Sequence, residues 1–143
     1  MKKGVDMIGV TVCTFCHDGN GNYLFGKRSQ NCRDEQGMWE PAGGGSMEFG
    51  ERVEDTLRRE IKEEICADVI EYEFLGFRDV HREVDGINTH WIALDFKVRV
   101  NKEQVAIGEP EFCDEIRWAP ISDVPNPQHS QMGVCLERYQ EKW

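Results

Sequence analysis

The chain has 143 residues, of which 39% are hydrophobic and 31% charged, so it is expected to be an ordinary soluble protein with a single domain over residues 1–143. Its formal net charge of −10 argues against tight binding to a nucleic-acid backbone, because such binding requires a basic face. A small phosphorylated substrate is still compatible, since a bound metal ion can invert the charge locally.

The N-terminal residues carry no targeting signal that we recognise. Residues 1–6 are not followed by an unbroken apolar segment that ends in small residues, and no stretch is long and apolar enough to span a membrane. We therefore expect a cytoplasmic protein that does not bind membranes. In that compartment the six cysteines are expected to be reduced.

The first part of the chain predicts a pair of strands. Residues 7–16 are β-branched and apolar, the turn-forming residues 18–22 follow, and residues 23–28 predict the returning strand. A polar loop then leads through residues 38–42 into three consecutive glycines. These glycines either let the backbone approach a phosphate or a metal, or only permit an unusual loop path.

A helix is predicted after the glycines, because apolar residues recur every four positions and form one stripe. The stripe consists of Val53, Leu57, Ile61 and Ile65. On this helix Glu64 lies about 40° and Glu60 about 80° from the centre of the stripe, whereas Glu63 lies about 140° away. Two of the three carboxylates therefore lean toward the edge of the core.

Carboxylates spaced three or four residues apart on a helix repel by about 0.2–0.5 kcal/mol per pair. A divalent cation with hard oxygen ligands, such as Mg²⁺, would offset this repulsion. The alternative is a charged surface helix in which Arg58, Arg59 and Lys62 pair with the acidic side chains.

The second half of the chain predicts a long hairpin, a short strand and a terminal helix. Residues 69–84 are mostly extended, Asp85–Gly86 is a strong hairpin turn, and residues 87–100 alternate as a strand with Ile92 to Val100 apolar on one face. Residues 115–118 predict a short strand. Residues 128–143 predict a helix whose inner face carries Met132, Cys135 or Leu136, Tyr139 and Trp143. The fold class is therefore α+β, with a mixed sheet between helices.

The stretch from Gly45 to Ala67 resembles the Nudix box. That pattern is Gly, five residues, Glu, seven residues, Arg-Glu, an aliphatic residue, one residue, Glu-Glu, one residue, Gly and an aliphatic residue. Gly45 and Glu51 stand at the required distance, and the run 59–64 follows in register. The chain departs from the pattern at its end, where Cys66 replaces Gly and Ala67 replaces a larger aliphatic residue. The family glycine suits a left-handed helix cap, so Cys66 leaves the end of the helix open.

The resemblance implies an α/β/α sandwich and a MutT-like enzyme that hydrolyses a pyrophosphate bond in a nucleoside diphosphate-X compound. By position, Glu60, Glu63 and Glu64 match the family's Mg²⁺ or Mn²⁺ ligands, and a loop carbonyl such as that of Gly44 can join them. The first substrate expectation is a nucleoside triphosphate. ADP-ribose or another nucleotide sugar is the alternative, and a non-catalytic nucleotide-binding module is a third.

The resemblance also implies catalytic roles. Glu51 and Arg59 match a pair that supports the metal ligands, and the general base stays open between Glu60, Glu64 and Glu115. His81 and His90 are further candidates for the base, since imidazole titrates near neutral pH.

Substrate contacts are expected from a cation and from aromatic rings. Arg28 could bind phosphate, and three aromatic residues could stack on a base or belong to the core instead. They are Phe25, Trp39 and Trp91. The expected partner is a small nucleotide and no nucleic-acid polymer, and a homodimer is compatible with the sequence.

Overall fold

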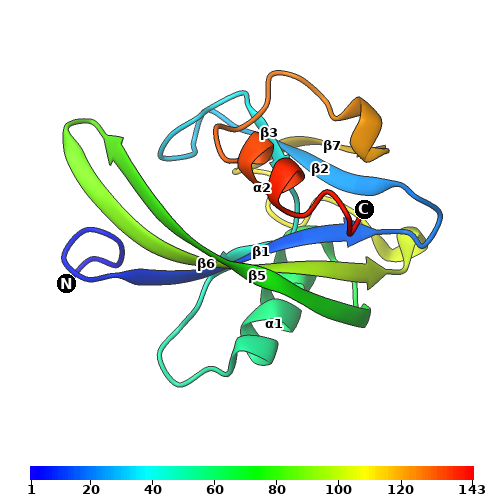
Figure 1. Ribbon diagram of the computed structural model, residues 1–143, viewed down its shortest axis with the longest axis horizontal. Coiled ribbons are helices and arrows are strands. Elements are labelled where there is room, and N and C mark those ends of the chain that lie inside the picture. The colour runs from blue at the N-terminus through cyan, green and yellow to red at the C-terminus, as the bar shows by residue number, and fades with distance from the viewer.

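The computed structural model describes residues 1–143 and forms one mixed sheet with helices on its two sides (Figure 1). The strands are β1 (Gly9–His17), β2 (Tyr23–Arg28), β3 (Trp39–Pro41), β4 (Gly45–Ser46), β5 (Val69–Val84), β6 (Ile87–Val100) and β7 (Cys113–Ala119). The α-helices are α1 (Val53–Ile65) and α2 (Met132–Arg138), and short 3₁₀ helices cover Lys102–Gln104 and Ile121–Asp123.

The sheet opens at its centre. Its main strand order is β3-β2-β1-β6-β5, with β4 beside β1 and β7 beside β2. β1 runs parallel to β6 along its whole length, but it pairs with β2 only at His17 and Tyr23, next to the turn between them. β1 and β2 therefore diverge from this turn, and the gap between them is where a ligand can enter.

Two hydrophobic clusters hold the layers together. One lies between α1 and the β1–β6 strands and includes Leu57, Ile61 and Phe96; the other lies under α2 and includes Phe15 and Met132. Figure 1 shows α1 and α2 on opposite sides of the sheet. The expected α+β sandwich is confirmed.

Helix α1 begins and ends through its own local chemistry. At its start the backbone N–H of Arg52 donates to the carboxylate of Asp55 (3.1 Å), which satisfies one free backbone donor. At its end Cys66 adopts φ 61° and ψ 16°, and its N–H donates to the carbonyl of Lys62. The helix therefore stops where the family pattern has glycine, although the residue here carries a Cβ.

The predicted terminal helix was too long. α2 covers only Met132–Arg138, because the chain before it is bonded to β3: the N–H of His129 donates to the carbonyl of Trp39 (2.8 Å). The inner face was predicted correctly, since Met132, Cys135 and Tyr139 are buried. No helix of the structure has the length and apolar character needed to cross a membrane.

Candidate functional site

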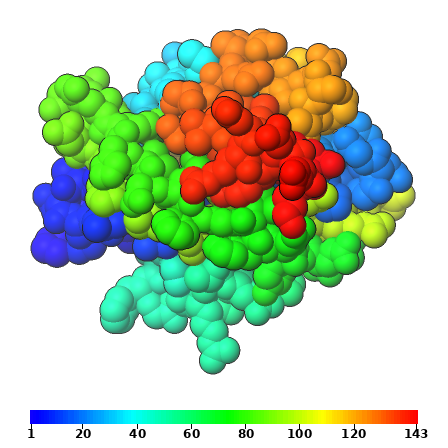
Figure 2. All heavy atoms as spheres, in the orientation of Figure 1, coloured from blue at the N-terminus to red at the C-terminus, as the bar shows by residue number.

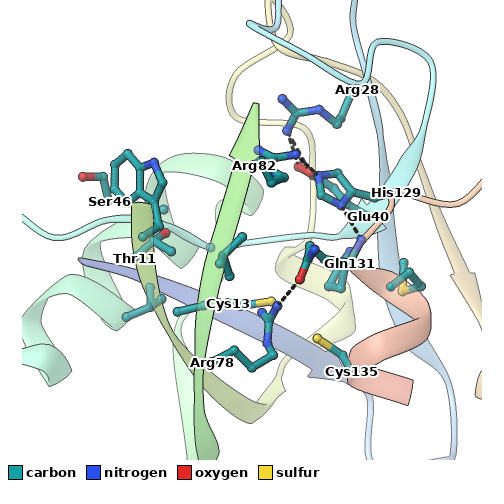
Figure 3. A pocket seen from close by; sticks show the side chains of 18 of the residues that line it. Thr11, Cys13, Arg28, Glu40, Ser46, Arg78, Arg82, His129, Gln131 and Cys135 are labelled. Carbon is teal, nitrogen blue, oxygen red and sulfur yellow. Dashed lines mark hydrogen bonds and ion pairs between the residues drawn. The ribbon is translucent and has the colours of Figure 1, made fainter. Parts of the chain in front are cut away.

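Two adjoining hollows open where β1 and β2 diverge. The first, which we call the sheet cleft, has a volume of about 390 Å³ and lies between β5, β6 and the segment leading into α2 (Figure 3). The second, the helix cleft, has a volume of about 370 Å³ and is bounded by β2, β7 and the C-terminal half of α1. Both are lined by Arg28, Glu40, Gly45 and Glu64, so these residues mark the junction.

Two carboxylates of α1 reach the clefts because they lie beside the apolar stripe: Glu64 lines both clefts and Glu60 lines the helix cleft. Glu60 is only 9% exposed, and Glu64 accepts a hydrogen bond from the backbone N–H of Gly43 (3.0 Å). A Cβ on Gly45 would collide with the Glu60 carboxylate. At Gly45, then, the absence of a side chain is what allows the loop to pass directly over an acidic group.

Arg59 bonds to three carboxylates of the acidic cluster. Its guanidinium binds both carboxylate oxygens of Glu51, at 2.7 and 2.9 Å, and also donates to Glu60 (2.8 Å), Glu63 (3.2 Å) and the carbonyl of Ser46 (3.1 Å). These bonds lower the pKa of Glu51 to about 2, chiefly through the hydrogen bonds from Arg59. The structure thus brings Glu51 and Arg59 together as a pair that orients the other carboxylates.

Glu64 has no positively charged partner in the junction, whereas Glu60 pairs with Arg59. Burial raises the pKa of Glu64 well above its usual range, and the nearby carboxylates of Glu40 and Glu60 add to the effect. Burial likewise raises the pKa of Glu60, against the lowering effect of Arg59. A positive charge placed here would stabilise both ionised carboxylates.

The carboxylates of Glu60 and Glu64 each have an oxygen free to bind a cation. Glu60 uses only Oε1, toward Arg59, and Glu64 uses only Oε2, toward Gly43. The remaining oxygens make no hydrogen bond and are not sealed from solvent. Free hard oxygen donors at an acidic junction suit Mg²⁺ or Mn²⁺. The backbone of Gly44 also lines the sheet cleft.

Glu63 lies apart from Glu60 and Glu64. Its side chain is 51% exposed, its only ion pair is with Arg59, and it lines neither cleft. This agrees with the larger angle from the apolar stripe that the helical wheel gives it. The three box glutamates do not converge on one point with their present side-chain conformations.

Arg28 reaches the junction but is already paired. Its Nη1 donates to both oxygens of Glu40 (3.0 and 2.8 Å), while Nε and Nη2 bind the backbone and side chain of Asp34. Sequence reasoning gave Glu40 no role, although it stands three residues before Gly43, the first residue of the glycine loop. Burial raises the pKa of Glu40 despite this partner.

Only one of the three candidate stacking residues faces a cleft. Trp91 lines the sheet cleft, whereas Phe25 has no exposed surface and Trp39 is 3% exposed. Phe25 and Trp39 belong to the cluster under α2. As placed here, neither offers a ring face to a ligand, so both are corrected to core residues.

Glu115 is not brought to the junction. It is half-exposed, pairs with Arg117 (2.9 Å) and lines neither cleft, while its neighbour Ile116 lines the helix cleft. Successive strand residues point to opposite faces, which is why Glu115 points away. His81 and His90 also line neither cleft.

The sheet cleft has a polar wall that sequence reasoning missed, in which Arg78 pairs with Asp95 and Arg82 pairs with Asp34 and Glu35. Figure 3 shows Arg78, Arg82, His129 and Gln131 around it. Arg78 and Arg82 come from β5, while His129 and Gln131 come from the segment before α2. No local motif marks these residues, since only the tertiary fold brings the two segments together.

The fold is a sandwich built on a mixed sheet. Helix α1 carries acidic side chains that Arg59 orients, and the glycine loop passes over them. These features together define the class of protein. A family model described as "NUDIX domain" matches residues 7–139, and the chain belongs to this family. The resemblance of the box is thereby confirmed.

Relatives and solved structures are consistent with this membership. The chain is 45% identical over 51 residues to "Nucleoside triphosphatase NudI" of Salmonella arizonae, a match that covers 36% of this chain and 36% of that protein. It therefore matches only about a third of the length of the curated relatives. NudI of Salmonella agona is 43% identical over 51 residues, with the same coverage of both chains.

Two solved structures share the fold over nearly the whole chain. A MutT NUDIX hydrolase from Burkholderia pseudomallei has a TM-score of 0.81 and 24% identity, covering 94% of this chain and 99% of that one. The NUDIX domain of NrtR from Shewanella oneidensis, complexed with ADP ribose, has a TM-score of 0.73 and 17% identity, covering 99% and 90%. At these identities the likeness concerns the fold.

Proposed function

We propose that this protein is a metal-dependent hydrolase that cleaves a pyrophosphate bond in a small nucleotide, with a nucleoside triphosphate as its first candidate substrate. One observation carries the proposal: Glu64, where the two clefts meet, and Glu60, in the helix cleft, each keep one carboxylate oxygen that accepts no hydrogen bond. Family membership and the name of the NudI relatives support it.

The donor set at the junction fits Mg²⁺ or Mn²⁺. Glu60 and Glu64 would hold the ion, joined by the carbonyl of Gly44 and by Glu63 once its side chain leaves Arg59. The bound ion would neutralise charge on the pyrophosphate and acidify a water molecule. Arg59, fixed by both oxygens of Glu51, would keep the Glu60 carboxylate oriented.

In this proposal, one of the box carboxylates removes the proton from the attacking water. Glu64 is the preferred base, because it lines both clefts and one of its carboxylate oxygens accepts no hydrogen bond. Glu60 is the alternative. Glu115 would need a rearrangement of β7 to take part, since it pairs with Arg117 and lines neither cleft.

The sheet cleft is the proposed place for the rest of the nucleotide. Its wall offers the guanidinium group of Arg33 for phosphate oxygens and the ring of Trp91 for stacking, whereas Arg82 is already paired with Asp34 and Glu35. Arg28 would contribute a guanidinium group that Glu40 holds in place. The ADP ribose in the NrtR structure supports a nucleotide sugar as the alternative substrate.

The test is hydrolysis of a nucleotide panel with Mg²⁺ and then Mn²⁺. The panel holds triphosphates, oxidised triphosphates, ADP-ribose, nucleotide sugars and dinucleoside polyphosphates. Glu64→Gln is compared with Glu54→Gln, which removes an exposed carboxylate that pairs with Arg58 on the same helix. We expect metal-dependent turnover that falls by orders of magnitude in Glu64→Gln and is unchanged in Glu54→Gln.

A non-catalytic nucleotide-binding module is the competing function. It predicts no turnover on any panel member, together with metal-dependent nucleotide binding that raises the melting temperature. Retention of Glu51, Glu60, Glu63 and Glu64 favours the hydrolase, because a module that only binds has no need of the complete acidic set.

A further inference from the structure

The β5–β6 hairpin extends beyond the body of the protein, as Figure 2 shows at the upper left. Successive residues of each strand point to opposite faces of the hairpin. Val80 and Trp91 line the sheet cleft, whereas Asp79, His81 and His90 lie on the opposite face. This opposite face is not used by the proposed hydrolase.

We propose that Asp79, His81 and His90 form a second metal site. The site is specific for divalent transition-metal ions, and Zn²⁺ serves as the example of this class. Among groups of three metal-ligating side chains, this is the one whose ligand atoms all lie within 4.8 Å of one another. The pairing of β5 with β6 produces the cluster. His81 is directly opposite His90, and Asp79 is two residues before His81 on the same face.

The distances suit a tetrahedral ion. Ligand bonds of about 2.0–2.1 Å at a tetrahedral angle place two ligand atoms about 3.4 Å apart. The distance from His90 Nε2 to Asp79 Oδ1 is 3.4 Å. The ring centroids of His81 and His90 are 4.1 Å apart, with a tilt of 31°, and a ring nitrogen of His81 lies within 4.8 Å of the other two ligand atoms.

The ligand chemistry separates this site from the acidic junction. Two imidazoles and one carboxylate favour Zn²⁺, Ni²⁺ or Cu²⁺, whereas the all-oxygen donors of Glu60 and Glu64 favour Mg²⁺ or Mn²⁺. Three protein ligands leave a fourth position for water. Glu83 lies two residues after His81 on the same face of β5 and adds negative charge to this face.

A simple ion pair between His90 and Asp79 does not account for the whole cluster. It leaves the His81 imidazole stacked against His90, with no hydrogen bond to the protein. A metal ion shared by the two neutral rings and the carboxylate gives all three side chains a partner, and it would clamp β5 to β6 behind the sheet cleft.

The test follows the histidine side chains by NMR during a Zn²⁺ titration with excess Mg²⁺ present. The protein has four histidines, so His17 and His129 serve as internal controls. We expect the ring signals of His81 and His90 to shift together and to saturate at one equivalent of Zn²⁺. This readout also separates the site from the six free cysteines, because zinc bound to thiols would leave both rings unchanged.

A variant confirms the assignment. His81→Asn with His90→Asn should lose one equivalent of bound Zn²⁺ in calorimetry and the accompanying rise in melting temperature, whereas His17→Asn should lose neither. Glu64→Gln should keep the site, so failure of the hydrolase proposal would not touch this one. Absence of joint His81 and His90 shifts, or unchanged zinc stoichiometry in the double variant, would overturn it.

Discussion

Cys66 holds a backbone conformation that favours glycine. With φ 61° it lies in the left-handed region, where a Cβ costs about 1–2 kcal/mol. Glycine removes this cost but loses more freedom on folding, by about 0.5–1 kcal/mol. We expect Cys66→Gly to raise the free energy of unfolding in urea by about 0.5–1 kcal/mol.

Cys66→Ala is the control for that experiment. Alanine keeps the Cβ, so the free energy of unfolding should change little. If Cys66→Ala stabilises as much as Cys66→Gly, the thiol and not the backbone conformation is responsible, and the argument for a strained helix cap fails.

Gly45 provides the second test at this scale. A methyl group there would collide with the Glu60 carboxylate, so Gly45→Ala should displace the acidic group and lower turnover at least about tenfold, which corresponds to about 1.4 kcal/mol. Gly133→Ala is the matched control. Its Cβ would meet no atom within 4 Å in α2, so it should leave turnover unchanged and stabilise by about 0.5–1 kcal/mol.

Two strands and the final helix depend on one buried polar network. Arg78 of β5 donates to both oxygens of Asp95 in β6 (2.7 and 2.8 Å), and the hydroxyl of Tyr139 donates to the same carboxylate (2.5 Å). Asp95 is fully buried. Asp95→Asn would leave the Arg78 charge without its counterion, and we expect a loss of about 3–5 kcal/mol in thermal or urea unfolding.

Tyr139→Phe provides the graded comparison. It removes one hydrogen bond but leaves the Arg78–Asp95 pair, so the expected loss is about 1 kcal/mol. Equal losses in Tyr139→Phe and Asp95→Asn would mean that packing of the tyrosine ring, and not charge pairing, determines the stability of this region.

Elements with strong local signals were predictable. The bounds of β5 and β6 match the predicted ranges, because a clear hairpin turn separates two long extended segments. α2 was predicted too long, since apolar spacing alone cannot show that His129 is bonded to β3. The two-residue strand β4 was missed within the glycine loop, because only its pairing with β1 defines it.

At the scale of the whole molecule, the acidic helix and its loop were predictable, and the cleft was not. Helical spacing alone separates Glu64 from Glu63. In contrast, the sheet cleft needs the divergence of β1 and β2 and the approach of His129 to Arg82, which are 47 residues apart. Neither event leaves a local pattern in the sequence.

The Glu64 carboxylate has no positively charged partner at the junction, so its ionisation should make the metal-free protein less stable as pH rises. Burial and the neighbouring carboxylates raise the pKa of Glu64, so the folded state holds this proton more tightly than the unfolded state. The resulting stabilisation is complete below the ordinary glutamate pKa of about 4.3 and is lost as pH rises through the folded-state value. Burial lowers the pKa of His129 and acts in the opposite direction, so the wild-type curve alone does not isolate Glu64.

The difference in melting temperature between Glu64→Gln and the wild type isolates the contribution of Glu64. Glu64→Gln cannot ionise, so its melting temperature should exceed that of the wild type at about pH 8, and the gap should narrow toward about pH 5. Glu54→Gln should show no such pH-dependent gap, because Glu54 is half-exposed and pairs with Arg58. Saturating Mg²⁺ should raise the wild-type melting temperature at pH 8 and leave Glu64→Gln nearly unchanged, since the ion compensates the charge that the variant lacks. A gap that is constant with pH and insensitive to Mg²⁺ would show that the Glu64 carboxylate is already solvated, and would remove the electrostatic reason for a cation at the junction.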